Sequence, residues 1–314
     1  MKPYRLRRLR WGRFAVGALV LALAALPSAS SAAPSAAGGN GVPAFRHVFV
    51  VVMENLDYQS AMATPGLAHL AATWALATNS YGVSHPSLPN YLALTGGSTF
   101  SITSDCVDCY VSAPNLFSQL AGAHRSFNAF LEGVPGSCYL SPWGGVGYAS
   151  KHNPFRYFDN VRSSRSLCSH LRPLSQLASV LAGPSAGVAQ FVWVTPNLCH
   201  DGHDCAPIIA AQWLTTFVRS VTSSAAWRDH GVLFVTWDES DGGSSGVIGG
   251  RVVGSGGGGH VMTLVIAPGL RRGLRVGVPY NHYSLLATIE DTFGLPLLAN
   301  ARHATALSSF FRGP

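Results

Sequence analysis

The sequence predicts an α/β fold, a three-layer sandwich in which a mostly parallel central sheet carries helices on both faces. Several short runs are continuously apolar and rich in β-branched or aromatic residues, which is typical of strands buried on both faces. Other segments carry apolar residues three and four positions apart, as amphipathic helices do. The two kinds alternate along the chain. The expected strands are 47–53, 189–195, 232–237 and 261–267, and the expected helices are 65–76, 115–123, 172–182, 208–221 and 283–295.

The N-terminus has the order of a secretory signal peptide. A basic stretch at 1–14 precedes an apolar run that is too short to span a bilayer comfortably, and small residues follow it. We expect a signal peptide over 1–32, cleaved after Ala32 or Ala33, then a flexible segment over 33–44 and one domain over 45–314. The mature protein is therefore expected outside the cytoplasm, secreted or in the cell envelope, with no stable membrane span.

The basic charge of the chain belongs mostly to this signal. The sequence has 21 basic and 14 acidic residues, and six of the basic residues lie within 1–32, which leaves 15 against 14. A nearly balanced mature chain gives no electrostatic footprint for nucleic acid.

Six cysteines follow the predicted signal, and an even count in an exported chain indicates disulfides. The short spacings favour Cys106 with Cys109 and Cys199 with Cys205, which leaves Cys138 for Cys168. Zinc is the alternative for Cys106 and Cys109, but no second CxxC exists to complete a tetrahedral site.

Polar side chains follow three of the predicted strands. Glu54 and Asn55 come after the first, Asp238 and Glu239 come after 232–237, and the segment 197–204 follows 189–195. Ligands of open α/β sheets bind beyond the carboxyl ends of the strands. Carboxylates gathered there repel one another unless a cation or a proton lies between them. Oxygen-rich ligands favour a hard or borderline divalent cation.

The stretch VSHPSLPNYLALTGG places Ser87 in a stiff turn, because Pro86 and Pro89 fix their backbone angles. A helix start behind this turn would present backbone N–H groups to an anion. The glycine-rich stretch 241–260 has neither a P-loop pattern nor a strand–GxGxxG–helix frame, so a loop or hairpin is expected there.

Taken in order, VVMEN, HPSLPNY, KHNPF, PNLCHDGHD, TWDESDG and NHYSLLATIEDTFGL resemble the bacterial phosphoesterase family of secreted acid phosphatases and phospholipases C. This family belongs to the alkaline phosphatase superfamily, and the resemblance covers nearly the whole mature chain, so that 45–314 would be a phosphoesterase domain. It implies that Ser87 is the nucleophile and a metal ligand. It also implies that Glu54, Asn55, Asp238 and Glu239 hold metal.

The two-zinc alkaline phosphatases carry an Asp-His pair where this chain has Asp238 and Glu239. The difference favours one divalent cation over two, with calcium, magnesium, manganese and zinc all open as its identity. His282 matches the family's helix start and is assigned to substrate binding, whereas His260 has no family match.

The remaining site residues follow from phosphoryl chemistry. Phosphoryl transfer needs charge stabilisation more than covalent help. Asn90, one turn after Ser87, is expected to donate its amide to a phosphoryl oxygen. His152 and His203 could donate when protonated, which favours mildly acidic pH because unperturbed histidine titrates near ~6.5. We assign Asn90 and His203 to catalysis, and His152 and Asp201 to substrate binding.

Alternatives stay open for several residues. Ser84 competes with Ser87 as nucleophile, Asp201 and His203 could lie behind the metal ligands, and His85 could only support the turn. Asp57, Asp204 and Asp241 are most simply solvated loop acids.

These assignments predict a secreted, metal-dependent phosphomonoesterase that works through a phosphoserine intermediate on small phosphate esters, lipid-borne phosphoinositides included. The alternative is a phospholipase C-type diesterase, which would need a wide apolar groove or an extra lipid-binding domain. A non-catalytic binding protein is disfavoured because the nucleophile and all four metal ligands are present together.

Overall fold

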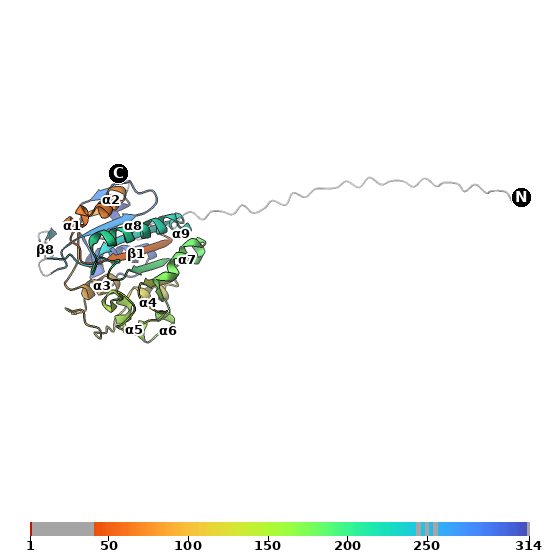
Figure 1. The fold of residues 1–314 in the computed structure, drawn as a ribbon, viewed down its shortest axis with the longest axis horizontal. Coiled ribbons are helices and arrows are strands. Elements are labelled where there is room, and N and C mark those ends of the chain that lie inside the picture. The colour runs from red at the N-terminus through yellow and green to blue at the C-terminus, as the bar shows by residue number, and fades with distance from the viewer. Residues whose placement is uncertain (2–40, 243–245, 249–250, 254–256, 313–314) are drawn as a thin grey trace. The chain divides into compact units, whose positions relative to one another are not determined.

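A mixed sheet lies among the helices (Figure 1). It has nine strands in the order β10-β2-β9-β6-β1-β5-β3-β4, with β11 beside β2. The computed structural model describes Met1 and residues 41–242, 246–248, 251–253 and 257–312, so the predicted signal and most of 33–44 lie outside the described residues. The strands of the sheet are β1 (His47–Met53), β2 (Ala75–Tyr81), β3 (Phe127–Leu131), β4 (Leu171–Pro173), β5 (Phe191–Thr195), β6 (Gly231–Trp237), β9 (His260–Ile266), β10 (Arg275–Val276) and β11 (Tyr280–Asn281).

The pairing places most strands parallel. Strand β1 pairs in parallel with both β5 and β6, and β3 pairs in parallel with β5 and β4. Strand β9 runs antiparallel to β6 and to β2, so β2 points the same way as β1. The carboxyl ends of β1, β2, β3, β5 and β6 therefore meet at one edge of the sheet, called the carboxyl edge below.

Helices cover both faces of the sheet. Strand β1 shows why, since alternate side chains of a strand point to opposite faces: Val48, Val50 and Val52 belong to one apolar cluster, while Phe49, Val51 and Met53 belong to the other. The first cluster is covered by α3 (Ser87–Gly96), α4 (Leu116–Gly122), α5 (Asp159–Arg162), α6 (Arg165–Cys168) and α10 (His282–Phe293). The second is covered by α1 (Tyr58–Ala63), α2 (Pro65–Thr73), α7 (Leu177–Ala182), α8 (Pro207–Ser223) and α9 (Ala225–Arg228). The predicted α/β sandwich is confirmed.

Sequence patterns missed or misplaced several elements. The helix expected over 65–76 ends at Thr73, and β2 begins at Ala75. The apolar residues at its end fit either period, and the polar Thr78 and Asn79 interrupt the strand pattern. The helix expected over 172–182 begins instead with the last residues of β4, and only Leu177–Ala182 is α-helical. The hairpin option for 241–260 agrees with the backbone pairing of β7 (Gly246–Ile248) with β8 (Arg251–Val253).

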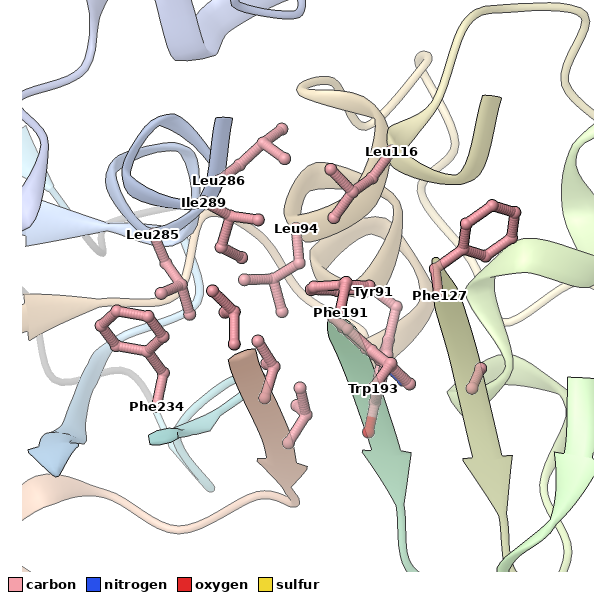
Figure 2. Packing of buried hydrophobic residues seen from close by; sticks show 14 of the residues in the cluster. Tyr91, Leu94, Leu116, Phe127, Phe191, Trp193, Phe234, Leu285, Leu286 and Ile289 are labelled. Atoms are coloured by element: carbon pink, nitrogen blue, oxygen red, sulfur yellow. The ribbon is translucent and has the colours of Figure 1, made fainter. Parts of the chain in front are cut away.

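Helix α3 is fully enclosed, because each of its ten residues from Ser87 to Gly96 is buried. Figure 2 shows Tyr91 and Leu94 of this helix beside Trp193 of β5 and the leucines of α10. Gly97 ends the helix with a φ of +74°, a left-handed conformation that glycine adopts without steric cost. The first residue of α3 therefore has a position fixed by packing along the whole helix.

Three disulfides join Cys106 to Cys109, Cys138 to Cys168 and Cys199 to Cys205, which confirms the predicted pairing. No free cysteine occurs in the described part of the chain, so the zinc alternative for Cys106 and Cys109 is excluded. Such bonds fit a protein that folds outside the reducing cytoplasm. None of the helices in the described ranges is both long and apolar enough to cross a bilayer.

Candidate active site

The ends of β1 and β6 bring the predicted metal ligands together. These strands are neighbours in register, and the backbone N–H of Asp238 donates to the carbonyl of Met53 over 3.0 Å. The backbone N–H of Asn55 in turn faces Oδ1 of Asp238 at 3.3 Å. Asn55 has a φ of 38°, a left-handed conformation that asparagine tolerates better than most residues. The structure thus places the Glu54–Asn55 pair beside the Asp238–Glu239 pair, and their role as metal ligands stays a prediction.

Ser87 points its hydroxyl into this group of carboxylates. Its Oγ lies 3.1 Å from Oε2 of Glu54 and 3.1 Å from Oε1 of Glu239. The competing Ser84 directs its hydroxyl to the carbonyl of His85 at 3.1 Å, within the same turn. Of the two serines, Ser87 is therefore the one positioned beside the acids.

Asn90 supports the turn before Ser87. Its Oδ1 accepts hydrogen bonds from the backbone N–H groups of Val83 and Ser84 at 2.9 and 3.0 Å. Its Nδ2 donates to the carbonyls of Ser84 and Pro86 at 2.7 and 3.2 Å. Both amide hydrogens are used in the turn, so this arrangement shows Asn90 shaping the loop around the nucleophile. Its role as a phosphoryl donor stays a prediction.

His152 lies between two acids inside the protein. Its Nε2 is 3.1 Å from Oε1 of Glu54 and its Nδ1 is 3.2 Å from Oδ2 of Asp201. Its ring stacks on Tyr91 with centroids 5.1 Å apart, and the Tyr91 hydroxyl donates to Oε1 of Glu54 at 2.8 Å. Burial lowers the pKa of His152, but the Glu54 and Asp201 carboxylates outweigh burial and raise this pKa to about 9.

The same contacts keep Glu54 ionised. Burial raises the pKa of this carboxyl, but the imidazolium of His152 outweighs burial and lowers the pKa to about 2. The backbone N–H of Glu54 also donates to the carbonyl of Asp201 at 3.1 Å. His152 and Asp201 thus fix the position of Glu54, and His152 keeps it ionised. This arrangement agrees with the alternative that Asp201 lies behind the metal ligands.

Lys151 was missed by the sequence reasoning, although it is the residue before His152 in KHNPF. Its Nζ lies 3.3 Å from Ser87 Oγ, 3.0 Å from Oδ2 of Asp105 and 3.4 Å from Nε2 of His203. A signal for it exists, because Lys151 is the only lysine in the sequence beyond residue 2. Burial lowers the pKa of Lys151, but Glu54 and Asp105 outweigh burial and raise it, so the ammonium stays charged.

Asp105 is the second residue that the sequence reasoning missed. Its Oδ1 accepts from the backbone N–H of Leu88 at 2.9 Å, at the start of α3, while its Oδ2 holds Lys151. The carboxylate therefore fixes the lysine relative to the helix that carries Ser87.

The other histidines take different places. His203 is part exposed, with Nδ1 2.7 Å from Oδ1 of Asp204 and its backbone N–H donating to Oδ1 of Asp201 at 2.9 Å. His85 contacts Oε2 of Glu239 through Nδ1. His282 is buried and its Nε2 contacts the carbonyl of Asp238, and burial lowers its pKa to about 4. A neutral His282 in this place supports the end of β6, and its assignment to substrate binding stays a prediction.

Four oxygen-bearing groups face one another around Ser87. Besides the serine and the two glutamates, Asn55 takes part through its amide nitrogen, which donates to Oε2 of Glu54 at 3.2 Å and to Oε1 of Glu239 at 3.3 Å. The nearby Oδ2 of Asp238 is buried without a hydrogen-bond donor in the described ranges. Burial, with Glu54 and Glu239 adding to it, raises the pKa of Asp238 well above its usual range.

The chemistry of these side chains suits a bound cation. Positive charge would stabilise both the buried acceptor that lacks a donor and the carboxylates that face each other. The side chains do not yet converge on one metal position. Within the residues described, no three His, Cys, Asp or Glu side chains form a group that could hold a metal ion. The oxygen set is therefore suited in kind to a divalent cation.

Comparisons with known proteins show the family of this chain. The Phosphoesterase family profile matches residues 40–296. The chain belongs to this family. It is 32% identical over 301 residues to a phosphatidylinositol-3-phosphatase of Mycobacterium tuberculosis, an alignment that covers 93% of this chain and 92% of the relative. It is also 27% identical to an acid phosphatase of Aspergillus fumigatus, with 81% of this chain matching 56% of that longer protein.

Solved structures show the same fold as this phosphoesterase at low sequence identity. An alkaline phosphatase superfamily protein from Vibrio parahaemolyticus superposes with a TM-score of 0.56 at 13% identity, covering 85% of this chain and 72% of its own. A sulfatase-like structure from Bacteroides thetaiotaomicron gives a TM-score of 0.56 at 11% identity, covering 85% of this chain and 74% of its own. These two likenesses support the architecture of the sheet and its helices.

Proposed function

We propose that this phosphoesterase hydrolyses phosphate monoesters and that Ser87 is its nucleophile. One observation carries the proposal: the buried Ser87 hydroxyl lies 3.1 Å from two carboxylates and 3.3 Å from the ammonium of Lys151. A serine hydroxyl needs a base or a cation to become nucleophilic, and a phosphoryl group needs positive charge around its oxygens. Both requirements meet at this atom.

The reaction proceeds in two displacements. Ser87 Oγ forms a bond to phosphorus while the bond to the ester oxygen breaks, and the hydroxyl proton passes to a neighbouring carboxylate, Glu239. The leaving oxygen takes a proton from His203, which lies beside Lys151 and reaches solvent. A water molecule then gives one proton to His203 as its oxygen attacks phosphorus. The bond to Oγ breaks, Oγ takes its proton back from Glu239, and inorganic phosphate leaves.

Lys151 supplies the fixed positive charge for this transfer. Its ammonium is held by Asp105 at 3.0 Å, and Lys151 is the sole lysine of the sequence beyond residue 2. A monoester carries one more anionic oxygen than a diester, so a charged donor beside the nucleophile favours the monoester.

A divalent cation would be held by Glu54, Asn55, Asp238 and Glu239, together with the Ser87 oxygen. When bound, it would stabilise negative charge on the transferred group and favour the deprotonated serine. Dialysis against a chelator should abolish hydrolysis and lower the thermal midpoint of unfolding, and adding back magnesium, calcium, manganese or zinc one at a time should restore both. Full activity in the chelated protein would contradict the metal assignment.

The substrates we propose are small phosphate monoesters, with lipid-borne phosphoinositides among them, and the place of action is outside the cytoplasm. The similarity to a protein named phosphatidylinositol-3-phosphatase supports the first statement. Three disulfides support the second.

The deciding experiment compares a monoester with a diester. Purified protein is assayed with p-nitrophenyl phosphate and with p-nitrophenyl phosphorylcholine, which share a leaving group. The assays run from about pH 4 to about pH 10, which spans the usual pKa of histidine and approaches that of lysine. We expect the monoester to have the higher kcat/KM, with an acid to neutral optimum. A higher kcat/KM for the diester would replace this proposal with the phospholipase C-type alternative.

A further inference from the structure

A few large apolar side chains are exposed in the described part of the chain. Apart from the terminal Met1, they are Val107, Tyr110, Trp143, Val146, Ile208 and Ile209. Isolated apolar residues on a surface need no explanation, but a group placed around one opening does. Their positions in the fold therefore decide whether they act together.

Each pair belongs to a segment that also supplies a residue of the active site. Val107 and Tyr110 follow Asp105, which holds Lys151. Trp143 and Val146 lie in the segment after β3 that leads into Lys151 and His152. Ile208 and Ile209 begin α8, directly after the segment that carries Asp201 and His203. All three segments thus surround the carboxyl edge of the sheet, and we call these six side chains the apolar rim.

Hydrogen bonds tie the three segments into one frame. The buried Arg156 donates through Nη1 to the carbonyl of Val107 at 3.0 Å and through Nε to the carbonyl of Leu140 at 3.1 Å. The backbone N–H of Leu198 donates to the carbonyl of Gly147 at 2.8 Å. A disulfide fastens each segment as well, at Cys106, Cys138 and Cys199. The rim residues therefore sit on a fixed support.

The Trp143 segment has the chemistry of a membrane interface. Trp143 is 75% exposed and Val146 is 94% exposed. The stretch 133–150 around them contains no Asp, Glu, Lys, Arg or His. It is pinned at its base, where the backbone N–H of Gly145 donates to the carbonyl of Gly133 at 2.7 Å. Tryptophan prefers the headgroup level of a bilayer, and an uncharged segment enters that region at the least cost.

We propose that the apolar rim docks the protein on a lipid surface and presents the active site to phosphorylated headgroups in it. This inference rests on the proposed function, because it needs a substrate that resides in the membrane. The occupant we infer is a bilayer, because the exposed Trp143 and the uncharged stretch 133–150 both suit the headgroup level. The rim would insert only to the interface, as reversible binding requires.

The test removes the apolar character of the most exposed pair without touching the site. Wild type, the double variant Trp143→Ser with Val146→Ser, and the control Trp143→Phe with Val146→Leu are compared. Binding is measured by co-sedimentation with phosphatidylcholine vesicles that contain no phosphoinositide. Hydrolysis is measured with p-nitrophenyl phosphate, with dibutanoyl phosphatidylinositol 3-phosphate, and with its long-chain form in vesicles.

We expect the serine variant to lose vesicle binding and at least about tenfold of its kcat/KM on the long-chain substrate, while both soluble substrates react as with wild type. The control variant should behave as wild type throughout. Absence of vesicle binding by wild type, or equal binding by the serine variant, would overturn the proposal. So would a dimer that dissociates in the serine variant, because the rim would then join two copies. A protein that binds vesicles through the rim but hydrolyses no monoester would refute the proposed function alone.

Discussion

Glu54 and Glu290 are both wholly buried, but their pKa values are shifted in opposite directions. Glu54 at the end of β1 has its pKa lowered to about 2, whereas Glu290 in α10 has its pKa raised to about 8. Burial pushes both values upward. Glu54 faces the imidazolium of His152 and the ammonium of Lys151, but Glu290 has mainly neutral partners, the backbone N–H of Leu298 at 2.9 Å and the side chain of Gln119.

The difference shows what a buried carboxylate needs to stay charged. Around Glu290, Oε2 of the glutamate and Oε1 of Gln119 are both buried without hydrogen-bond partners among the residues described, which a proton on the glutamate would help to satisfy. Around Glu54, two cationic side chains come from one short segment, 150–152. The active site is thus the place where the fold supports buried negative charge, and the expected effects below test that contrast.

The largest effect is expected for the hydroxyl beside Glu54. Ser87→Ala should lower kcat/KM for p-nitrophenyl phosphate by at least about 10⁴-fold, because the attacking oxygen is lost while the helix around it stays packed. Ser84→Ala, three positions away and turned to the carbonyl of His85, should keep most of the activity. A reversed order of the two variants would show that Ser84 is the nucleophile.

Glu54→Gln and Glu290→Gln compare the two glutamates directly. The first should lower kcat/KM by about 10³-fold, because it removes the charge next to Ser87. The second should leave kcat/KM within about twofold, since Glu290 lies in α10 away from the site. Circular dichroism confirms that both variants are folded. Equal losses of activity would mean that charge at Glu54 plays no special part.

Lys151→Met should lower kcat/KM for the monoester by about 10²-fold, because the transferred group loses a charged donor. The diester p-nitrophenyl phosphorylcholine should lose less, so the ratio of the two kcat/KM values narrows. Lys151→Arg keeps the charge with another shape and is expected between wild type and the methionine variant. Equal losses on both esters would contradict a role for the lysine in recognising the extra anionic oxygen.

The smallest effect concerns stability at Glu290. Below about pH 4.5 this carboxyl is protonated in the folded and the unfolded chain alike. Between pH 4.5 and about 8 the unfolded chain loses the proton and the folded chain keeps it, so the free energy of unfolding falls as pH rises.

Glu290→Gln removes this titration, and it should raise the free energy of unfolding by about 1–3 kcal/mol above pH 8 with little change near pH 4. Urea unfolding at several pH values measures the difference. A stabilisation that does not depend on pH would show that Glu290 is ionised in the fold.

Sequence reasoning located the acids of the site well because their positions follow from strand ends. Glu54, Asn55, Asp238 and Glu239 each come directly after a buried strand, and neighbouring parallel strands must bring such residues together. Sequence reasoning missed Lys151 and Asp105 because neither residue comes directly after a strand. Lys151 lies on a short 3₁₀ turn, and Asp105 reaches the site only because the chain returns to the start of α3.

Side-chain roles were harder to predict than positions. The structure shows polar atoms of Asn90 and His282 in contact with the protein's own backbone, and the roles of both residues toward substrate stay predictions. Which partner a buried amide or imidazole finds depends on packing that no short motif encodes. Strand β2 was missed for a similar reason, since the partners that make ALATNSY a strand are far away in sequence.

Because lysine is rare in this sequence, a reagent specific for lysine would modify the protein mainly at the active site. Beyond Lys2, an amine-reactive reagent applied above the raised pKa of Lys151 would find a single lysine side chain, and that target lies 3.3 Å from Ser87 Oγ. A peptide containing labelled Lys151 would indicate a site without ligand. A decrease in this labelling as inorganic phosphate is added would measure how much of the site is occupied. Ligands of this enzyme could then be ranked by mass spectrometry without any turnover.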